Sequence, residues 1–378
     1  MDLKSLLLSS DEKIVRILRR TLGDLDISVE HCLTPETALR HLTRERFEAI
    51  IVDCAGPGSA DVLRSARSAP CNKRAVAVAI LETGVGLRSA FDIGAHFILY
   101  KPVSPERARS SFRAARALMK KERRRNARVA LRIPVEMSSR ETGTQLNVDS
   151  SDFGEGGMAV TLPRRIKPQG QWQLSFTLPG TRAKVNLDAE LAWEGTGRQA
   201  GLRFLSHSRE LEGQVREWLS RNSPDVEKDD PPVRCQLTDL TLGGCYLGIT
   251  SPFPISTRVI VSMSAAGLIV KIDGLVRVMH PDQGMGVEFI QRTPQVRAQL
   301  EKFLRILTES QNLSPELLVE PDGLEYDAAE NSKHAEPMLE QEDALLELFR
   351  NQSNLSPDSF LAELRKQRGL AVGASISA

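Results

Sequence analysis

The first 120 residues alternate short apolar runs with stretches of helical periodicity. Between the runs, as from Asp11 to Leu22, apolar residues recur three and four positions apart, which is typical of a helix with one buried face. Strands that alternate with helices predict a parallel, doubly wound (flavodoxin-like) α/β domain over residues 1–120. The expected strands are Leu6–Leu8, Ile27–Glu30, Ala49–Val52, Ala75–Ile80 and Phe97–Tyr100.

Two polar residues follow strands of this predicted sheet. Asp53 comes directly after the third strand, and Lys101 comes directly after the fifth. In such sheets the ligand site lies at the carboxyl ends of the strands. Together with Gly94-Ala95 and Pro102, these residues resemble the receiver domain of two-component response regulators. The resemblance implies that Asp53, with Lys101, is a possible phosphoacceptor.

The region also departs from the receiver pattern. Ser9 and Ser10 stand where receivers carry an acidic pair that holds magnesium, and Asp11 lies just beyond. The Thr or Ser that receivers carry after the fourth strand is absent: Ala79 is the nearest ungapped match, and Thr83 fits only with a gap. A hard dication needs several anionic oxygens, and phosphoryl transfer depends largely on the metal. We therefore expect a pseudo-receiver with Asp53 salt-bridged to Lys101, serving protein contact or dimerisation. Phosphorylation of Asp53 is the alternative.

The pattern changes after a predicted helix over residues 104–125. Short runs with a period of two follow, and a helix over residues 209–221 closes the series. Several short strands and a terminal helix predict an antiparallel β-barrel over residues 121–222. The expected strands are 129–135, 158–162, 172–176, 185–193 and 201–204.

The barrel sequence recurs in outline further along the chain. Asp239–Gly244 parallels Asp152–Gly157 at an offset of 87 residues, and Gly286–Phe289 parallels Gly201–Phe204. We predict a second antiparallel barrel over residues 229–310.

Residues 311–378 are predicted to form a flexible acidic tail. Residues 319–340 have the composition of a linker. Two similar segments, 312–316 and 354–358, contain Ser-Pro followed by an acidic residue, a favourable start for a helix. We expect a partly disordered tail with marginal helices over 342–349 and 358–367.

The candidate chemistry is concentrated where the first barrel begins. Arg123, Arg124 and Arg128 supply guanidinium forks that fit phosphate oxygens and stack on flat bases. Asp152 precedes a glycine-rich turn, where a carboxylate can accept the N–H groups of a guanine edge.

The order and spacing of these residues resemble PilZ domains, whose signature is Arg-x-x-x-Arg followed by Asp-x-Ser-x-x-Gly. PilZ domains of this kind bind cyclic di-GMP. The resemblance implies that Arg124 and Arg128 clamp phosphates and stack on guanines, with Arg123 adjacent. It also implies that Asp152 binds a guanine edge and that Gly157 allows close approach of the backbone. Gly154 stands in place of Ser, and the loss of one hydrogen bond would weaken binding about tenfold or less.

The second module has the opposite set of residues. Asp239, Thr241 and Gly244 form a complete Asp-x-Thr-x-x-Gly, but no Arg-x-x-x-Arg precedes them. Upstream lie the acidic Asp229-Asp230, which would repel phosphate, and a single Arg234 with no evident partner. We expect a turn kept for the fold. A composite site, with arginines of one module facing the turn of the other, is the alternative.

Composition narrows the classes of function. With 50 basic and 49 acidic side chains, the chain has no global positive charge that would indicate nucleic-acid binding. Five cysteines without a C-x-x-C pair argue against a zinc site or a disulfide framework, and no apolar run is long enough to span a membrane. No catalytic or metal-binding constellation is evident.

We therefore predict a non-catalytic, cytoplasmic cyclic di-GMP effector. It would need no cofactor or metal, and a protein partner could bind through the receiver-like domain or the tail. Three alternatives remain: a scaffold that binds no nucleotide, a phosphorylation-dependent regulator, and a nucleic-acid-binding protein that uses Lys120–Arg128.

Overall fold

The chain forms two compact units in the computed structural model. It describes residues 3–69, 71–83, 93–125, 127–139, 141–163, 170–181, 184–195, 198–205, 209–222, 230–290, 293–309, 314–324, 343–351 and 355–374. One unit comprises residues 123–228, and the other comprises residues 1–122 and 229–378. The first barrel is therefore an insertion into a discontinuous unit that contains the receiver-like domain and the second barrel.

The N-terminal domain is the predicted parallel α/β structure. Its strand order, β2-β1-β3-β4-β5, is the doubly wound order found in flavodoxin-like proteins. The central strand β3 is buried at every residue because helices cover a parallel sheet on both faces. The strands are β1 (Leu3–Leu8), β2 (Ile27–Cys32), β3 (Ala49–Asp53), β4 (Val76–Leu81) and β5 (Phe97–Tyr100). The helices are α1 (Glu12–Gly23), α2 (Pro35–Arg44), α3 (Ser59–Ser68) and α5 (Pro105–Arg125).

The first barrel closes through six antiparallel strands. The ring runs β8-β7-β10-β11-β12-β9, and β9 pairs back with β8. A short strand, β6, pairs with the C-terminal residues of β8 and carries Arg128. The elements are β6 (Arg128–Ala130), β7 (Pro134–Ser139), β8 (Gln145–Gly154), β9 (Gly157–Thr161), β10 (Gln171–Thr177), β11 (Lys184–Glu194), β12 (Gln199–Phe204) and α6 (Arg209–Asn222).

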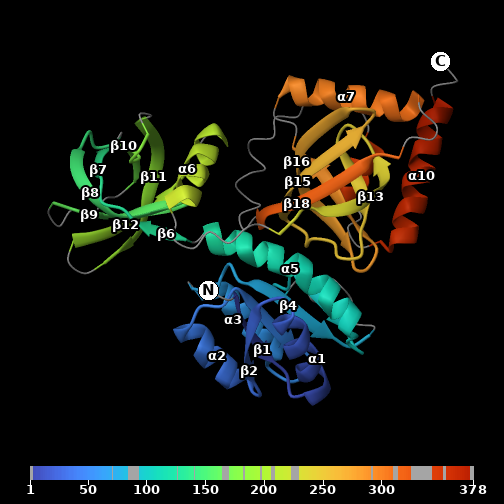
Figure 1. Cartoon of the computed structure of the whole chain (residues 1–378), viewed down its shortest axis with the longest axis horizontal. Coiled ribbons are helices and arrows are strands. Elements are labelled where there is room, and N and C mark those ends of the chain that lie inside the picture. The colour runs from blue at the N-terminus through green and yellow to red at the C-terminus, as the bar shows by residue number, and fades with distance from the viewer. Residues whose placement is uncertain are drawn as a thin grey trace. The chain divides into compact units, whose positions relative to one another are not determined.

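The second barrel is also closed, but by a strand from the region that we expected to be a tail. Its ring is β13-β14-β17-β16-β15-β18, and Figure 1 shows the orange β18 beside β15. The predicted boundary at residue 310 is therefore too early, because β18 alternates buried and less buried positions as a barrel strand does. The elements are β13 (Val233–Leu240), β14 (Gly244–Gly248), β15 (Thr257–Ala265), β16 (Leu268–His280), β17 (Gly284–Phe289), α7 (Pro294–Glu309) and β18 (Glu316–Leu324).

The two barrels share one ring in different chain order. When β8 is matched with β13, the strands β9, β12, β11 and β10 match β14, β17, β16 and β15. The first barrel's β7 then matches β18, so the strand that comes first in one barrel comes last in the other. The second barrel is thus a circular permutation of the first. This explains why no Arg-x-x-x-Arg precedes β13: the chain enters the permuted ring at a different strand.

The C-terminal residues that the structure describes form two helices, α9 (Ala344–Asn351) and α10 (Pro357–Ala374). Both occur close to where the sequence predicts helices, but neither is the marginal, unattached helix that we expected. Their buried apolar side chains form a cluster with Tyr246 and Val278 of the second barrel. The helix residues in this cluster are Leu345, Leu348, Phe349, Phe360 and Leu364. Figure 1 shows α10, in red, at the side of this barrel. Residues 325–342 lie outside the described part of the tail.

Helix α5 holds the second barrel through charged side chains. Asp230, where the described chain re-enters the discontinuous unit, accepts hydrogen bonds from Arg116 Nη2 (3.0 Å) and Lys120 Nζ (2.8 Å). The buried carboxylate of Glu122 accepts the backbone N–H of Leu324 at 2.8 Å. Burial opposes ionisation of Asp230, yet these hydrogen bonds keep its pKa below the usual value. Asp230 therefore anchors the chain to α5. Asp229 lies outside the described residues.

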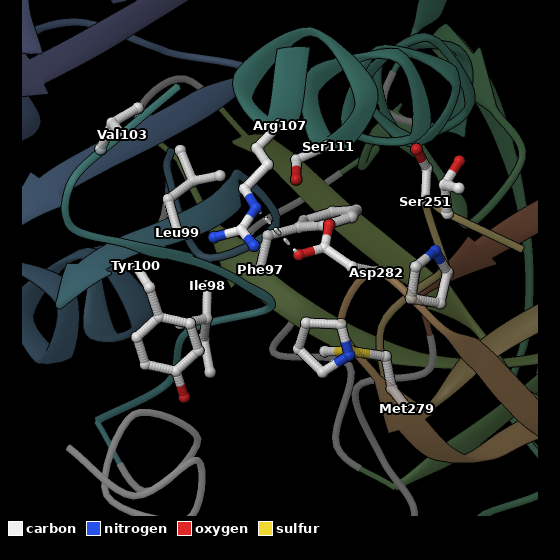
Figure 2. Close-up of a pocket in the computed structure, with 13 residues that line it drawn as sticks. Phe97, Ile98, Leu99, Tyr100, Val103, Arg107, Ser111, Ser251, Met279 and Asp282 are labelled. Carbon is white, nitrogen blue, oxygen red and sulfur yellow. Dashed lines mark ion pairs between the residues drawn. The ribbon is translucent and has the colours of Figure 1, made fainter. Parts of the chain in front are cut away.

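A small pocket lies between β5, α5 and the loops of the second barrel (Figure 2). Its lining is largely apolar, and its two charged residues, Arg107 and Asp282, form an ion pair at 3.3 Å. The pocket therefore presents no uncompensated charge to a ligand.

All five cysteines are free thiols, and burial raises the pKa of Cys235 to about 12. Within the described ranges, no helix has the length and apolar character needed to cross a membrane.

Candidate functional site

Four residues of the first barrel lie in one row across neighbouring strands. Asp152 of β8 is opposite Ala159 of β9, Ala159 is opposite Gly201 of β12, and Gly201 is opposite Trp193 of β11. Residues directly opposite each other in a sheet face the same side. The row therefore has a carboxylate at one end, an indole at the other, and two small residues between them.

The carboxylate end of the row carries an ion pair. Arg128 Nη1 lies 2.5 Å from Asp152 Oδ1, and the Ala159 backbone N–H donates to the same oxygen at 3.2 Å. The side chains of Arg128 and Asp152 remain 44% and 32% exposed, so a ligand can reach both groups. Two residues 24 positions apart in the sequence thus meet.

Arg123 and Arg124 occupy the last turn of α5 and are half-buried. The N–H of Ala127 donates to the carbonyl of Arg124 at 2.9 Å, and β6 begins at the next residue. The cluster is therefore held by a helix end that passes directly into the strand carrying Arg128.

The glycines of the turn allow close backbone packing. A Cβ atom on Gly157 would lie 2.2 Å from the carbonyl oxygen of Leu202, so no side chain fits there. A Cβ on Gly154 would lie 3.0 Å from the Ala127 carbonyl oxygen and 3.3 Å from Arg128 Cγ. The missing serine thus leaves room for the arginine segment to pack tightly against the turn.

Three further residues of this surface are not singled out by the sequence. Trp193 is 44% exposed, and its ring covers Gly201, where an added Cβ would lie 2.0 Å from the indole Nε1. Glu155, within the glycine turn, pairs with Arg216 of α6 at 2.9 Å and with Arg125 at 3.7 Å. A β-bulge between Leu191 and Trp193 shifts the register there.

The second barrel repeats the row with different side chains. Asp239, Tyr246, Gly286 and Val278 lie opposite one another in the same order, and bulges occur at the same two places. The Thr241 hydroxyl accepts from the N–H groups of Gly243 (3.2 Å) and Gly244 (3.0 Å), so it braces the turn itself. Arg234, which we expected to lack a partner, is paired with Glu316 of β18.

Asp53 in the receiver-like domain lies at the predicted strand end. Its carboxylate accepts the Ser9 hydroxyl at 3.0 Å and pairs with Lys101 Nζ at 2.9 Å. Burial lowers the pKa of Lys101, but its bonds to Asp53 and Glu82 outweigh this and raise it overall. Asp11 caps α1 by accepting the N–H groups of Lys13 and Ile14. Among the described residues, no group of three or more His, Cys, Asp or Glu side chains could hold a metal ion.

Comparison with known protein families identifies the first barrel. A family model described as "PilZ domain" matches residues 122–221. Residues 122–221 form a PilZ domain. The match includes Arg123, Arg124, Arg128 and the row from Asp152 to Trp193. The second barrel shares the PilZ ring in permuted order.

Similar solved structures resemble separate parts of the chain. The PilZ domain of CeSA from a cellulose-synthesizing bacterium is 20% identical, with a TM-score of 0.21, over 25% of this chain and 95% of that domain. A putative response regulator from Chloroflexus aurantiacus is 20% identical, with a TM-score of 0.29, over 30% of this chain and 98% of that one. A chemotaxis response regulator of Vibrio cholerae is 22% identical, with a TM-score of 0.29, over 30% and 99%. These likenesses are too weak to support a functional argument. No curated protein matches the chain.

Proposed function

We propose that the PilZ domain of residues 122–221 binds cyclic di-GMP and that the chain acts as a non-catalytic effector of this dinucleotide. The observation that carries the proposal is the meeting of Arg128 with Asp152 at one end of a row whose other end is the exposed Trp193. A ligand with two phosphates and two guanines needs cationic forks, a guanine acceptor and a flat stacking surface. All three are available on this face of the barrel.

Each group has a specific role in this proposal. Arg124 and Arg128 bind the phosphates, because guanidinium forks match two phosphate oxygens at once. Asp152 accepts N–H groups of one guanine after the ligand displaces Arg128 from it. Trp193, whose ring lies over Gly201, stacks on a base.

Isothermal titration calorimetry with cyclic di-GMP tests the proposal. The chain should bind the dinucleotide, and Arg124→Ala with Arg128→Ala should lower the affinity at least about 100-fold, because hydrogen bonds to charged groups contribute roughly 1.5–3 kcal/mol each. Arg132→Ala is the matched control, since Arg132 is an exposed arginine of the same barrel that pairs with Asp149. Absence of binding by the unaltered chain would favour the scaffold instead.

The receiver-like domain has a separate place in this proposal. With Asp53 held by Ser9 and Lys101, we propose that it contributes protein contacts and does not depend on phosphorylation. Acetyl phosphate with magnesium, and Asp53→Asn as the control, tests this role. A mass increase of one phosphoryl group that is lost in Asp53→Asn would restore the phosphorylation alternative.

A further inference from the structure

In the second barrel a distant segment covers the surface that the first barrel covers with its own Trp193. In the first barrel, the row from Asp152 to Trp193 ends in an exposed indole. In the second, the corresponding row from Asp239 to Val278 is covered by α9 and α10, which we call the C-terminal helix pair. The two surfaces have the same register and the same bulges, so the difference lies in what rests on them.

The helix pair rests on glycines. A Cβ added to Gly286 would lie 2.3 Å from Phe349 Cε1, and one on Gly243 would lie 2.5 Å from Leu346 Cδ1. At Gly286, the three nearest atoms all belong to Phe349, so the barrel itself leaves space for a side chain there. The absence of a side chain at position 286 is therefore needed for the helix pair and not for the barrel.

Aromatic rings fill the centre of this interface. Phe349 and Phe360 stack with their ring centroids 6.0 Å apart and their planes 12° apart. Phe360 also lies 5.5 Å from Tyr246 and 5.8 Å from His280, measured between centroids. Tyr246 occupies the position of Ala159 in the first barrel, so the second barrel presents an aromatic surface to the helices and not a small-residue floor.

Polar contacts fix the helix pair at both ends. Asp343 accepts the N–H of Gly243 at 3.2 Å while it caps α9, so the turn of the second barrel binds a carboxylate of the tail. At the other end, His280 Nε2 lies 2.7 Å from the Leu355 carbonyl and must donate to it, because a carbonyl oxygen can only accept. His280 Nδ1 then accepts the Tyr246 hydroxyl at 2.7 Å.

We propose that this face of the second barrel is a peptide-binding site whose ligand is the C-terminal helix pair, bound reversibly and anchored by Phe349 and Phe360. This face of the second barrel recognises an amphipathic helix. An aromatic residue of the helix packs on Gly286, and a carboxylate at its N-terminus accepts the N–H of Gly243. With eight residues, α9 is marginal as an isolated helix, so it folds as it docks. A corollary, which rests on the proposed function of the first barrel, is that the chain has one dinucleotide site and not two. The proposal rests on these contacts and not on the proposed function of the first barrel.

A matched pair of glycine substitutions in the full chain tests whether the helix pair depends on the packing of Phe349 against Gly286. Gly286→Ala should expel Phe349, whereas Gly248→Ala places its Cβ at an ordinary 3.5 Å from Thr238 Oγ1. We expect hydrogen exchange of the amides of residues 345–349 and 358–364 to accelerate at least tenfold in Gly286→Ala and to stay unchanged in Gly248→Ala. Exchange in β14, β16 and β17 should remain slow in both variants. Equal behaviour of the two variants, or loss of protection throughout the barrel in Gly286→Ala, would overturn the proposal.

Binding in trans tests reversibility. A fluorescein-labelled peptide of residues 343–374 is titrated into full-length Phe349→Asp, whose own helix pair is weakened, and followed by anisotropy. The peptide should saturate this variant, bind the unaltered chain at least tenfold more weakly, and fail to bind Phe349→Asp with Gly286→Leu. If Phe349→Asp does not fold, hydrogen exchange in the unaltered chain is measured instead. The amides of the helix pair should exchange faster than those of β14. If they exchange only when the whole chain unfolds, reversible binding is refuted. Two dinucleotides bound per chain would refute the corollary.

Discussion

The two barrels have the same six-stranded ring and present opposite surfaces on it. Corresponding carboxylates, Asp152 and Asp239, begin the two rows, and corresponding glycines, Gly201 and Gly286, lie within them. The first barrel covers its glycine with its own tryptophan and keeps an arginine at the carboxylate. The second covers its glycine with a phenylalanine from residue 349. The fold therefore provides the same surface in both barrels, and a few side chains determine what covers it.

The comparison also shows two uses of the glycine turn. In the second barrel, the Thr241 hydroxyl holds the turn amides. In the first barrel, Gly154 provides no hydroxyl, and the turn instead carries Glu155, which is paired with Arg216 and Arg125. The more complete sequence motif thus belongs to the barrel whose surface is occupied by the chain itself.

The largest effect that separates the barrels should come from their equivalent carboxylates. Asp152→Ala should weaken cyclic di-GMP binding about 30-fold, since hydrogen bonds to charged groups contribute roughly 1.5–3 kcal/mol. Asp239→Ala should leave the affinity unchanged, because the row of Asp239 is covered by the helix pair. Calorimetric titration measures both variants. Similar losses in the two would show that both barrels contribute to one site, as in the composite alternative.

A smaller loss is expected from the aromatic end of the first row. Trp193→Ala should weaken binding about tenfold, because stacking on an aromatic side chain contributes roughly 1–3 kcal/mol per base. Trp193→Phe keeps a stacking surface and should retain most of the affinity.

Tryptophan emission gives a second measurement of this end of the row. Trp193 is 44% exposed, whereas Trp172 and Trp218 are buried, so ligand should quench emission in the unaltered chain and not in Trp193→Phe. Quenching that persists in Trp193→Phe would remove Trp193 from the site.

Restoring the hydroxyl of the first turn should have a modest effect. Gly154→Ser would allow the first turn to be held as Thr241 holds the second, and we expect affinity to rise a few-fold, about the value of one hydrogen bond. The added Cβ must fit 3.0 Å from the Ala127 carbonyl oxygen. A loss of affinity, measured by the same titration, would show that close packing of the arginine segment matters more than the hydroxyl.

The smallest effect concerns pH and only the second barrel. Burial lowers the pKa of His280, and its bond to the Leu355 carbonyl opposes this in part. Because docking favours the neutral ring, docking should be strongest above pH about 6.5 and weaken as the pH falls below it towards the lowered pKa. Proteolytic cleavage within residues 343–374 is measured for the unaltered chain and for His280→Gln. The cleavage rate of the unaltered chain, divided by that of His280→Gln, should rise as the pH falls. A ratio independent of pH would exclude His280 from the docking contact.

Much of the architecture follows from local patterns. The alternation of apolar runs and helical stretches predicts the parallel sheet. Glycine turns and alternating strands identify two related barrels. These predictions succeed because each depends on a short segment whose period or turn chemistry is encoded locally.

The sequence of the tail shows the limit of such patterns. Ser314-Pro315-Glu316 and Ser356-Pro357-Asp358 carry the same start signal, yet the first leads into strand β18 and the second into helix α10. The first segment becomes a strand because β13 and β15 leave an open edge that it can pair with. The helices α9 and α10 are ordered because they pack on the barrel. Gly243 and Gly286 leave space for their side chains, and the rings of Tyr246 and His280 contact Phe360.

The amino-acid sequence by itself determined the periodicities, the repeated carboxylate-and-glycine turn and the arginine cluster. Only the tertiary structure decided that the second ring is permuted, that Asp230 is an anchor for α5, and that the second surface is filled by the end of the chain. The physical reason is the separation along the chain of the residues that interact. Periods and turns depend on neighbouring residues, whereas ring closure and the covering of a surface depend on which distant segment removes the most apolar area and backbone polarity from water.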